Sequence, residues 1–357
     1  MAKTEINSNK PNLAAIFATD IPCLLMGPPG VGKTAWINSE VKKMGLPMET
    51  IIASVREPAD FSGLPFITSE GVSFNIPSWA QRINKTGGVV FFDEITTAPP
   101  AVQAALLRVV HEKVVGDLRL GHNVKFLAAA NPAEYAANGY ELSAPLANRF
   151  IHLTIKEDAK DFIENFPTYW GEPPELPGLN TEKWMGKRGL VAAYLSTRPT
   201  NLLIFPENEA NRARAWPSPR TWDTTSRLLA ACDSLDESIP LVVGAVGEGE
   251  GIGFFNWLKT MDLPTPQFVL KNADTFDVPK RSDKTFAILS NLIPYVKENM
   301  EKKTWDACWT VIGKICEANQ PDVAAIWAIR LATDMKPEYG FPKTFIKFQH
   351  LFAGIQK

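Results

Sequence analysis

The sequence is poor in several features that define large classes of protein. Its four cysteines, Cys23, Cys232, Cys308 and Cys316, form neither a CxxC pair nor another metal-ligand spacing. This pattern argues against a disulfide scaffold and against a cysteine-ligated metal. No charge-free apolar run reaches about 18 residues, and the N-terminus has no apolar signal core, so we expect a cytoplasmic protein without membrane spans.

Charge of one sign is not in excess either, since 37 Lys and Arg stand against 39 Asp and Glu, a net charge of −2. Proteins that bind nucleic acid through its phosphates need clustered Lys and Arg, so this balance argues against nucleic acid as a partner. What the sequence does contain is an ordinary globular composition, with 45% hydrophobic and 21% charged residues among 357. That is enough for a sizeable core in roughly two or three domains.

Residues 1–155 alternate between short apolar runs and helical patterns, which is typical of a parallel sheet covered by helices. We therefore predict an α/β domain with three layers. The predicted strands are Ile21–Met26, Thr50–Ser54, Val89–Phe92, Val124–Ala130 and Phe150–Ile155, and the predicted helices are Gly32–Met44 and Ala101–Val110.

The remainder of the chain has a different character. Residues 166–179 and 198–219 are rich in proline and polar residues and are predicted to be loops. From Arg220 onward the pattern is mostly helical, with predicted helices at 222–232, 285–299, 305–318 and 323–333. We predict a helical lid at 156–261 and a helical C-terminal extension at 262–357, following the core domain at 1–155.

The clearest motif is GPPGVGKT at Gly27–Thr34, which follows a predicted strand and begins a predicted helix. This setting is typical of a P-loop, in which backbone N–H groups and a helix N-terminus bind phosphates. Lys33 is then expected to reach the β- and γ-phosphates of ATP, and Thr34 to ligate Mg²⁺. A chance glycine-rich turn is the alternative. The predicted nucleotide-binding residues are Gly27, Pro28, Pro29, Gly30, Val31, Gly32, Lys33, Thr34 and Ala35.

Two acids, Asp93 and Glu94, directly follow the apolar run VVFF. Ligands collect at the carboxyl ends of parallel strands, so Asp93 is predicted to hold Mg²⁺ there. Glu94 is predicted to act as the general base toward the attacking water. A helix-capping acid pair is the alternative.

Asn131 ends the run KFLAAAN at the end of the fourth predicted strand. Its amide would lie where it can hydrogen-bond the attacking water or the γ-phosphate. Because Asn131 precedes Pro132, a simple turn is the alternative.

Together, GPPGVGKT, VVFFDE, AAANP and LANRF resemble the ordered motifs of an AAA+ ATPase. A finer resemblance, to the MoxR family, rests on the segments PADFSGLP (58–65), FFDEITTAPPAVQAALLRVVHEKVV (91–115), SAPLANRF (143–150) and PSPRTW (217–222). The resemblance extends over roughly residues 10–260.

This resemblance implies two further site residues and a set of partners. Arg149, in LANRF, falls at the position of an arginine finger that acts on the neighbouring subunit's nucleotide, and Arg220, in PSPRTW, at the position of the lid arginine called sensor 2. Surface or core-edge arginines are the alternatives, with Glu141 as a possible partner of Arg149. The family further implies a ring of six subunits, a protein client and a separate von Willebrand A-domain partner.

Two segments resemble the hairpin inserts of this family, Val55–Pro77 and Glu112–Asn123. In the family such hairpins project toward the pore or face of the ring, so they are candidates for touching a client. An alternative for each residue is that it simply packs the hairpin onto the sheet. The candidate residues are Phe61, Phe66, Phe74, Lys113 and Arg119.

The leading hypothesis is therefore a Mg²⁺- and ATP-dependent motor that remodels a protein client or matures a complex. A nucleic-acid-acting motor or a component of an anti-phage system is the first alternative. A scaffold that binds ATP but barely hydrolyses it is the second.

Overall fold

The computed structural model describes residues 11–132, 135, 139–156, 158–168, 173–332, 335–340 and 342–347. The chain divides into two compact units, residues 1–156 and 157–357. The elements of the first unit are α1 (Leu13–Thr19), β1 (Cys23–Met26), α2 (Lys33–Lys43), β2 (Met48–Ile52), η1 (Ala53–Val55), α3 (Ala59–Ser62), β3 (Leu64–Thr68), β4 (Gly71–Asn75), α4 (Ser78–Thr86), β5 (Gly88–Asp93), η2 (Ile95–Thr97), α5 (Pro100–Glu112), β6 (Val114–Val115), β7 (Leu118–Arg119), β8 (Val124–Ala130), α6 (Ala144–Ala147) and β9 (Ile151–Thr154).

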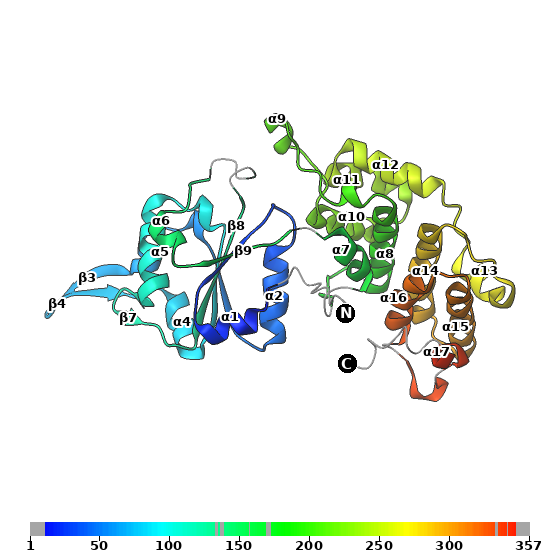
Figure 1. The fold of residues 1–357 in the computed structure, drawn as a ribbon, viewed down its shortest axis with the longest axis horizontal. Coiled ribbons are helices and arrows are strands. Elements are labelled where there is room, and N and C mark those ends of the chain that lie inside the picture. The colour runs from blue at the N-terminus through cyan, green and yellow to red at the C-terminus, as the bar shows by residue number, and fades with distance from the viewer. Residues whose placement is uncertain are drawn as a thin grey trace, which may run out of the picture. The chain divides into compact units, whose positions relative to one another are not determined.

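The first unit is built on a five-stranded parallel sheet in the order β2-β5-β8-β1-β9. Its central strands are continuous apolar runs because both of their faces are covered. In β5, Val89 and Phe91 face α1 and α2, whereas Val90 and Phe92 face the layer that contains α4 and α5. Figure 1 shows the sheet between these two layers. The predicted three-layer α/β domain is confirmed.

The predicted strands all form, with small shifts at their ends. The largest shift is in β2, predicted at Thr50–Ser54 and found at Met48–Ile52. Pairing with β5 begins earlier than predicted because the Pro47 carbonyl already accepts a hydrogen bond from the Val89 N–H, at 2.8 Å. Residues Ala53–Val55, at the carboxyl end of β2, form a 3₁₀ turn instead.

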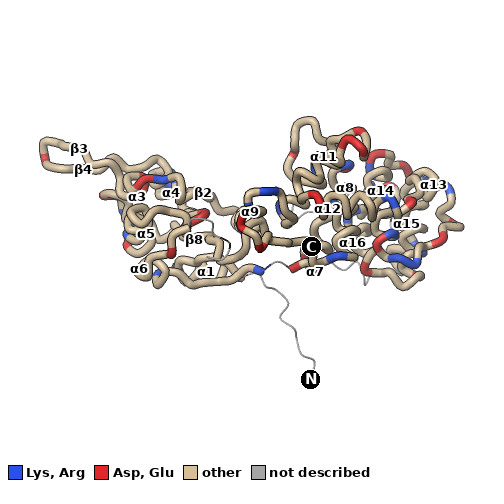
Figure 2. The backbone as a smooth tube through the Cα atoms, turned by 90° about the horizontal axis from the view of Figure 1, so that it is seen from above, with Lys and Arg blue, Asp and Glu red and all other residues tan. Residues whose placement is uncertain are grey.

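Both predicted hairpin inserts form. β3 pairs with β4 in antiparallel fashion, and β6 pairs with β7. The two hairpins contact each other, since the Phe74 N–H donates to the Asp117 carboxylate at 3.2 Å. A Cβ at Gly116 would lie 2.9 Å from Cβ of Phe74, so the turn of the second hairpin needs glycine. Figure 2 shows β3 and β4 projecting from the rest of the sheet unit.

The second unit is helical in the residues that the structure describes. Its elements are α7 (Ala159–Asn165), η4 (Phe166–Thr168), α8 (Thr181–Thr197), η5 (Pro199–Leu202), α9 (Glu209–Arg212), α10 (Pro219–Ala231), α11 (Leu235–Val246), α12 (Glu248–Lys259), α13 (Pro266–Lys271), η6 (Ala273–Thr275), α14 (Ser282–Glu298), α15 (Lys302–Glu317), α16 (Pro321–Ala332), η7 (Pro337–Tyr339) and α17 (Lys343–Lys347).

Helix α8 lies at the centre of this unit and joins its two halves. A Cβ at Gly186 would lie 2.6 Å from the Ser290 carbonyl oxygen of α14, and a Cβ at Gly189 would lie 2.4 Å from the Trp327 ring of α16. The helices can therefore approach closely only because these residues are glycine. Buried residues of the predicted lid and of the predicted extension belong to one core cluster. The predicted division between a lid ending at residue 261 and an extension beginning at residue 262 therefore stays a prediction.

Candidate active site

The P-loop connects β1 to α2, and its glycines have distinct steric roles. A Cβ at Gly27 would lie 2.5 Å from the Ile155 carbonyl oxygen, so the start of the loop tolerates no side chain. Gly30 and Gly32 have φ values of 79° and 90°, in the left-handed region that favours glycine. The loop can therefore turn back sharply into the first turn of α2.

The N-terminus of α2 is suited to an anion. Its N-cap is Gly32, which provides no side-chain cap, and the first turn contains no acidic residue. A Cβ added at Gly32 would meet no atom within 4 Å, so the loop encloses open space there. Free N–H groups and the positive end of the helix dipole are what bind phosphate at such positions. The residues present thus fit a nucleotide phosphate.

The side chain of Lys33 is folded back over the loop and is only 8% exposed. Its ammonium donates to the carbonyl oxygens of Gly27, at 2.7 Å, and Pro28, at 3.0 Å. It also donates to Oδ1 of Asn131 at 2.8 Å. The structure thus brings Asn131 to the P-loop lysine.

The predicted metal ligands also meet. Oγ1 of Thr34 donates to Oδ2 of Asp93 at 2.8 Å, joining the start of α2 to the end of β5. The other carboxylate oxygen of Asp93 accepts the Glu94 N–H at 3.0 Å. Mg²⁺ is usually held by one or two protein oxygens together with phosphate oxygens and water. A hydroxyl and a carboxylate oxygen in direct contact beside the P-loop fit this ion.

Glu94 is exposed and has a left-handed backbone, with φ 55° and ψ 39°. This conformation is uncommon for a residue other than glycine and occurs often at functional sites. Its carbonyl oxygen accepts hydrogen bonds from the N–H and the hydroxyl of Thr97, at 3.0 and 2.7 Å, which hold the turn. Its carboxylate accepts a hydrogen bond from the Ser54 hydroxyl at 3.3 Å.

Ser54 is a site residue that the sequence analysis missed. It lies in the 3₁₀ turn directly after β2, the strand that pairs with β5. A serine after a strand carries no motif, so the only available signal was its place at the carboxyl end of a strand next to the acidic one.

Arg149 and Arg220 are the two arginines that the resemblance implies. Among the described residues, neither contacts the cluster of side chains at the P-loop. Arg149 follows α6 and is half-buried, and its Nε is buried without a hydrogen-bond partner. No ion pair with Glu141 is present in this part of the chain. Arg220 lies in the first turn of α10, in the second unit, and is exposed. Their predicted roles remain predictions.

Comparison with known proteins agrees with this geometry. Residues 22–150 match the family model described as the AAA domain of the dynein-related subfamily. The sheet unit therefore has the AAA+ fold. The match confirms the AAA+ level of the resemblance and is silent on the MoxR family. No curated protein matches the chain.

Two solved structures with low similarity were also found. A Cytophaga hutchinsonii protein named as a candidate ATPase is 18% identical, with a TM-score of 0.35 over 75% of this chain and 88% of that one. A single-residue variant of RuvB from Thermotoga maritima is 14% identical, with a TM-score of 0.38 over 74% of this chain and 73% of that one. Among the described helices, none is long and apolar enough to cross a membrane.

Proposed function

We propose that the chain is an ATPase of the MoxR type that remodels a protein client. The observation that supports this most directly is the cluster at the P-loop, in which Lys33 contacts Asn131 while Thr34 contacts Asp93. One helix terminus and the ends of two neighbouring strands thus present an ammonium, a hydroxyl and a carboxylate to one space. That combination is the one used to bind a nucleoside triphosphate with its metal.

Each residue of the cluster has a separate task in hydrolysis. Lys33 exchanges its carbonyl contacts for phosphate oxygens and, together with the first turn of α2, holds the triphosphate. Thr34 and Asp93 would hold Mg²⁺, which neutralises charge on the phosphates. Glu94 accepts the proton of the attacking water, and Asn131 holds that water or the γ-phosphate in place.

Completion of the site by a second copy of the chain is part of the proposal. Arg149 is half-buried and forms no ion pair among the described residues, so its guanidinium needs no carboxylate of this chain to be released before it reaches another molecule. An arginine finger acting in this way is worth about 10³- to 10⁵-fold in rate. The ring of six subunits and the action of Arg220 on the nucleotide rest on the family resemblance alone.

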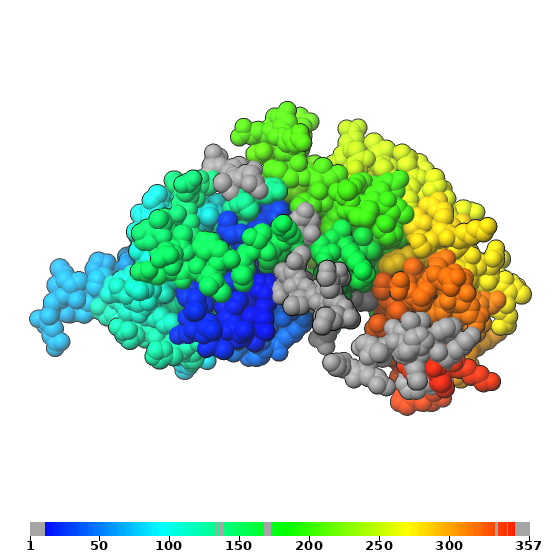
Figure 3. All heavy atoms as spheres, viewed as in Figure 1, coloured from blue at the N-terminus to red at the C-terminus, as the bar shows by residue number. Residues whose placement is uncertain are grey.

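The β3–β4 hairpin is the proposed client contact. Its exposed apolar side chains include Ile67, 89% exposed, together with Leu64, Val72 and Phe66. Figure 3 shows this hairpin standing out from the surface.

Two of the candidate residues are not available for contact with a client. Phe61 is fully buried against Trp79 and Phe92, and Lys113 is bound to Asp20. Phe74 is half-buried, and Arg119 is exposed. A von Willebrand A-domain adaptor would be a separate polypeptide.

Mixing inactive variants tests both the site and its completion by a neighbour. Lys33→Ala should lose ATP binding and hydrolysis, whereas Arg149→Ala should keep ATP affinity and lose about 10³-fold in rate. A mixture of the two should recover part of the activity, because some interfaces then pair an intact P-loop with an intact finger.

The controls are Lys43→Ala, an exposed lysine of the same helix, and Arg108→Ala, an exposed arginine of α5, and both should hydrolyse ATP normally. Absence of recovery in the mixture, together with a specific activity independent of protein concentration, would refute completion by a neighbour. Normal hydrolysis by Lys33→Ala would refute the proposed site.

A further inference from the structure

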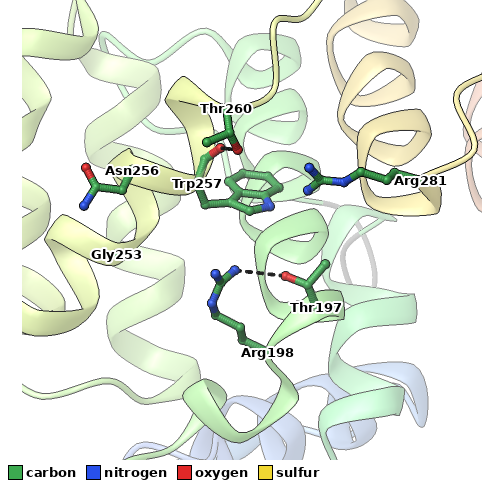
Figure 4. Close-up of a pocket in the computed structure, with 7 residues that line it drawn as sticks. All are labelled: Thr197, Arg198, Gly253, Asn256, Trp257, Thr260 and Arg281. Carbon is green, nitrogen blue, oxygen red and sulfur yellow. Dashed lines mark hydrogen bonds between the residues drawn. The ribbon is translucent and has the colours of Figure 1, made fainter.

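The helical unit contains a cavity of about 660 Å³ that the proposed ATPase does not use. It lies where the end of α8 meets α12 and the residue preceding α14, and Figure 4 shows its lining. This volume is within the range of ligand sites in proteins, about 300–1,000 Å³.

The charged side chains that line the cavity are both cationic. Two guanidinium groups, Arg198 and Arg281, line it, and none of its lining residues is acidic. In Figure 4 the two groups lie on different sides of the Trp257 indole, and the Asn256 side chain points away from it. The arginines are therefore the groups placed to recognise a ligand.

The acids closest to the cavity already have partners. Asp283 accepts from Arg281 at 2.6 Å and from the Trp257 indole N–H at 3.2 Å. Glu250 accepts from the Tyr194 hydroxyl at 3.0 Å and also from Asn201. Arg198 lies over the Tyr194 ring, 5.1 Å from its centroid, and has no carboxylate within ion-pair distance among the described residues. An anion that enters the cavity thus meets Arg198, which has no ion-pair partner among the described residues, and Arg281, which is shared with Asp283. Glu250, whose partners are neutral, keeps its negative charge beside Tyr194.

The form of the cavity favours carboxylates over a nucleotide or phosphate. Trp257 is only 4% exposed and presents little ring surface for stacking a base. The start of α14, which could bind phosphate through its N–H groups, already carries the Asp283 carboxylate in its first turn. Guanidinium groups bind carboxylates and phosphates alike through two parallel hydrogen bonds, so the preference for carboxylates rests on the occupied start of α14 and the buried indole.

The exposure of the two arginines favours a polypeptide over a small acid. The Arg281 side chain is 55% exposed and Arg198 is exposed as well. Small-molecule sites usually bury about 70–90% of the ligand surface, whereas both arginines here are exposed to solvent. We propose that the cavity binds an acidic segment of another polypeptide, with one carboxylate on Arg198 and a second on Arg281.

The test uses the full chain without nucleotide, so that it is independent of ATP hydrolysis. Binding of fluorescein-labelled hexaglutamate is followed by fluorescence anisotropy in 150 mM salt, roughly the physiological ionic strength. We expect saturable binding that Arg198→Gln and Arg281→Gln each weaken by about tenfold or more. Arg214→Gln, which removes an exposed arginine outside the cavity lining, is the matched control and should bind as the unaltered chain does.

The Arg281→Gln substitution removes the arginine that pairs with Asp283. A loss of hexaglutamate binding by this variant therefore supports the proposal only if the variant's circular dichroism and thermal unfolding match those of the unaltered chain. Arg198→Gln breaks no ion pair in the described residues and keeps the proposal testable by itself. Equal binding by Arg198→Gln and the unaltered chain would overturn the proposal. So would binding of inorganic phosphate or succinate to the two arginines without binding of hexaglutamate, since the ligand would then be a small anion.

Discussion

At the scale of single residues, the site depends on backbone conformations that few residues adopt. Gly27 must leave room for the Ile155 carbonyl, and Glu94 holds a left-handed conformation next to the strand that carries Asp93. Thr97 stabilises the left-handed turn at Glu94 through the Glu94 carbonyl oxygen. The Glu94 carboxylate accepts a hydrogen bond from the Ser54 hydroxyl, which orients it.

Ser54 is a positioning residue for the proposed general base, and its removal is expected to affect kcat alone. Ser54→Ala should lower kcat for ATP by about three- to tenfold, the value of one hydrogen bond of roughly 0.5–1.5 kcal/mol, while KM changes less than about twofold. Steady-state ATPase kinetics measure both constants.

Ser54→Thr keeps a hydroxyl and should restore most of the lost rate, and Ser69→Ala, in the turn between β3 and β4, should have no effect. A change in KM with constant kcat would indicate instead that Ser54 acts on nucleotide binding.

Most of the site residues could be predicted because each is tied to a local pattern. Lys33 and Thr34 follow a glycine-rich loop, and Asp93 and Glu94 follow an apolar strand, so their neighbours in the chain reveal them. Ser54 could not be predicted, because its partner Glu94 is distant in sequence and only the pairing of β2 with β5 brings the two together.

At the scale of elements, the predicted hairpins form but some of their residues are structural. Lys113, at the C-cap of α5, donates to both carboxylate oxygens of Asp20 and to the Val124 carbonyl. Lys125 of β8 donates to the same carboxylate at 2.9 Å. This group of charges joins the C-cap residue of α1 to the base of the second hairpin, which explains why Lys113 does not extend into solvent.

Asp20 is expected to stabilise the sheet unit in a pH-dependent way. Burial raises its pKa, but hydrogen bonds and attraction from Lys113 and Lys125 outweigh burial and hold the pKa below its ordinary value. A depressed pKa in the folded state means that the stabilisation is present above the unfolded pKa, near 3.9, and is lost as the pH falls through the folded value.

Asp20→Asn should therefore lower the free energy of unfolding by about 1 kcal/mol at pH 7, because the pair is partly exposed. Asparagine tolerates the left-handed conformation of this position, with φ 57°, so the substitution isolates the charge. Urea unfolding should show the difference between the two proteins shrinking as the pH falls below 3.9. An equal difference at pH 7 and pH 3 would contradict this assignment.

Helix α8 was not predicted, and its composition shows why. Residues on all of its sides are buried, so it lacks the one-sided apolar pattern that marks a surface helix. Gly186 and Gly189 further weaken its helical propensity, yet the close contacts with α14 and α16 require both. Tertiary packing outweighs the local preference of the chain at this point.

At the scale of the whole molecule, the shared core of residues 157–357 predicts how truncation acts. A chain ending at Met261 loses α14, α15 and α16 and exposes the side of α8 that α14 and α16 cover. We expect this fragment to aggregate or to lose cooperative unfolding of its helical part, measured by size-exclusion chromatography and thermal circular dichroism.

A chain ending at Lys347 retains every helix that the structure describes and is the matched control. A monomeric fragment ending at Met261 that unfolds cooperatively at the temperature of the full chain would show instead that the lid is an independent domain.

The glycine contacts of α8 have a mechanical consequence. At Gly186 and Gly189 the backbone of α8 packs directly against the Ser290 carbonyl and the Trp327 indole, with no side chain between them to take up a displacement. We therefore expect α8, α14 and α16 to move together. A rotation imposed on α8 during a catalytic cycle would then be passed on to α14 and α16.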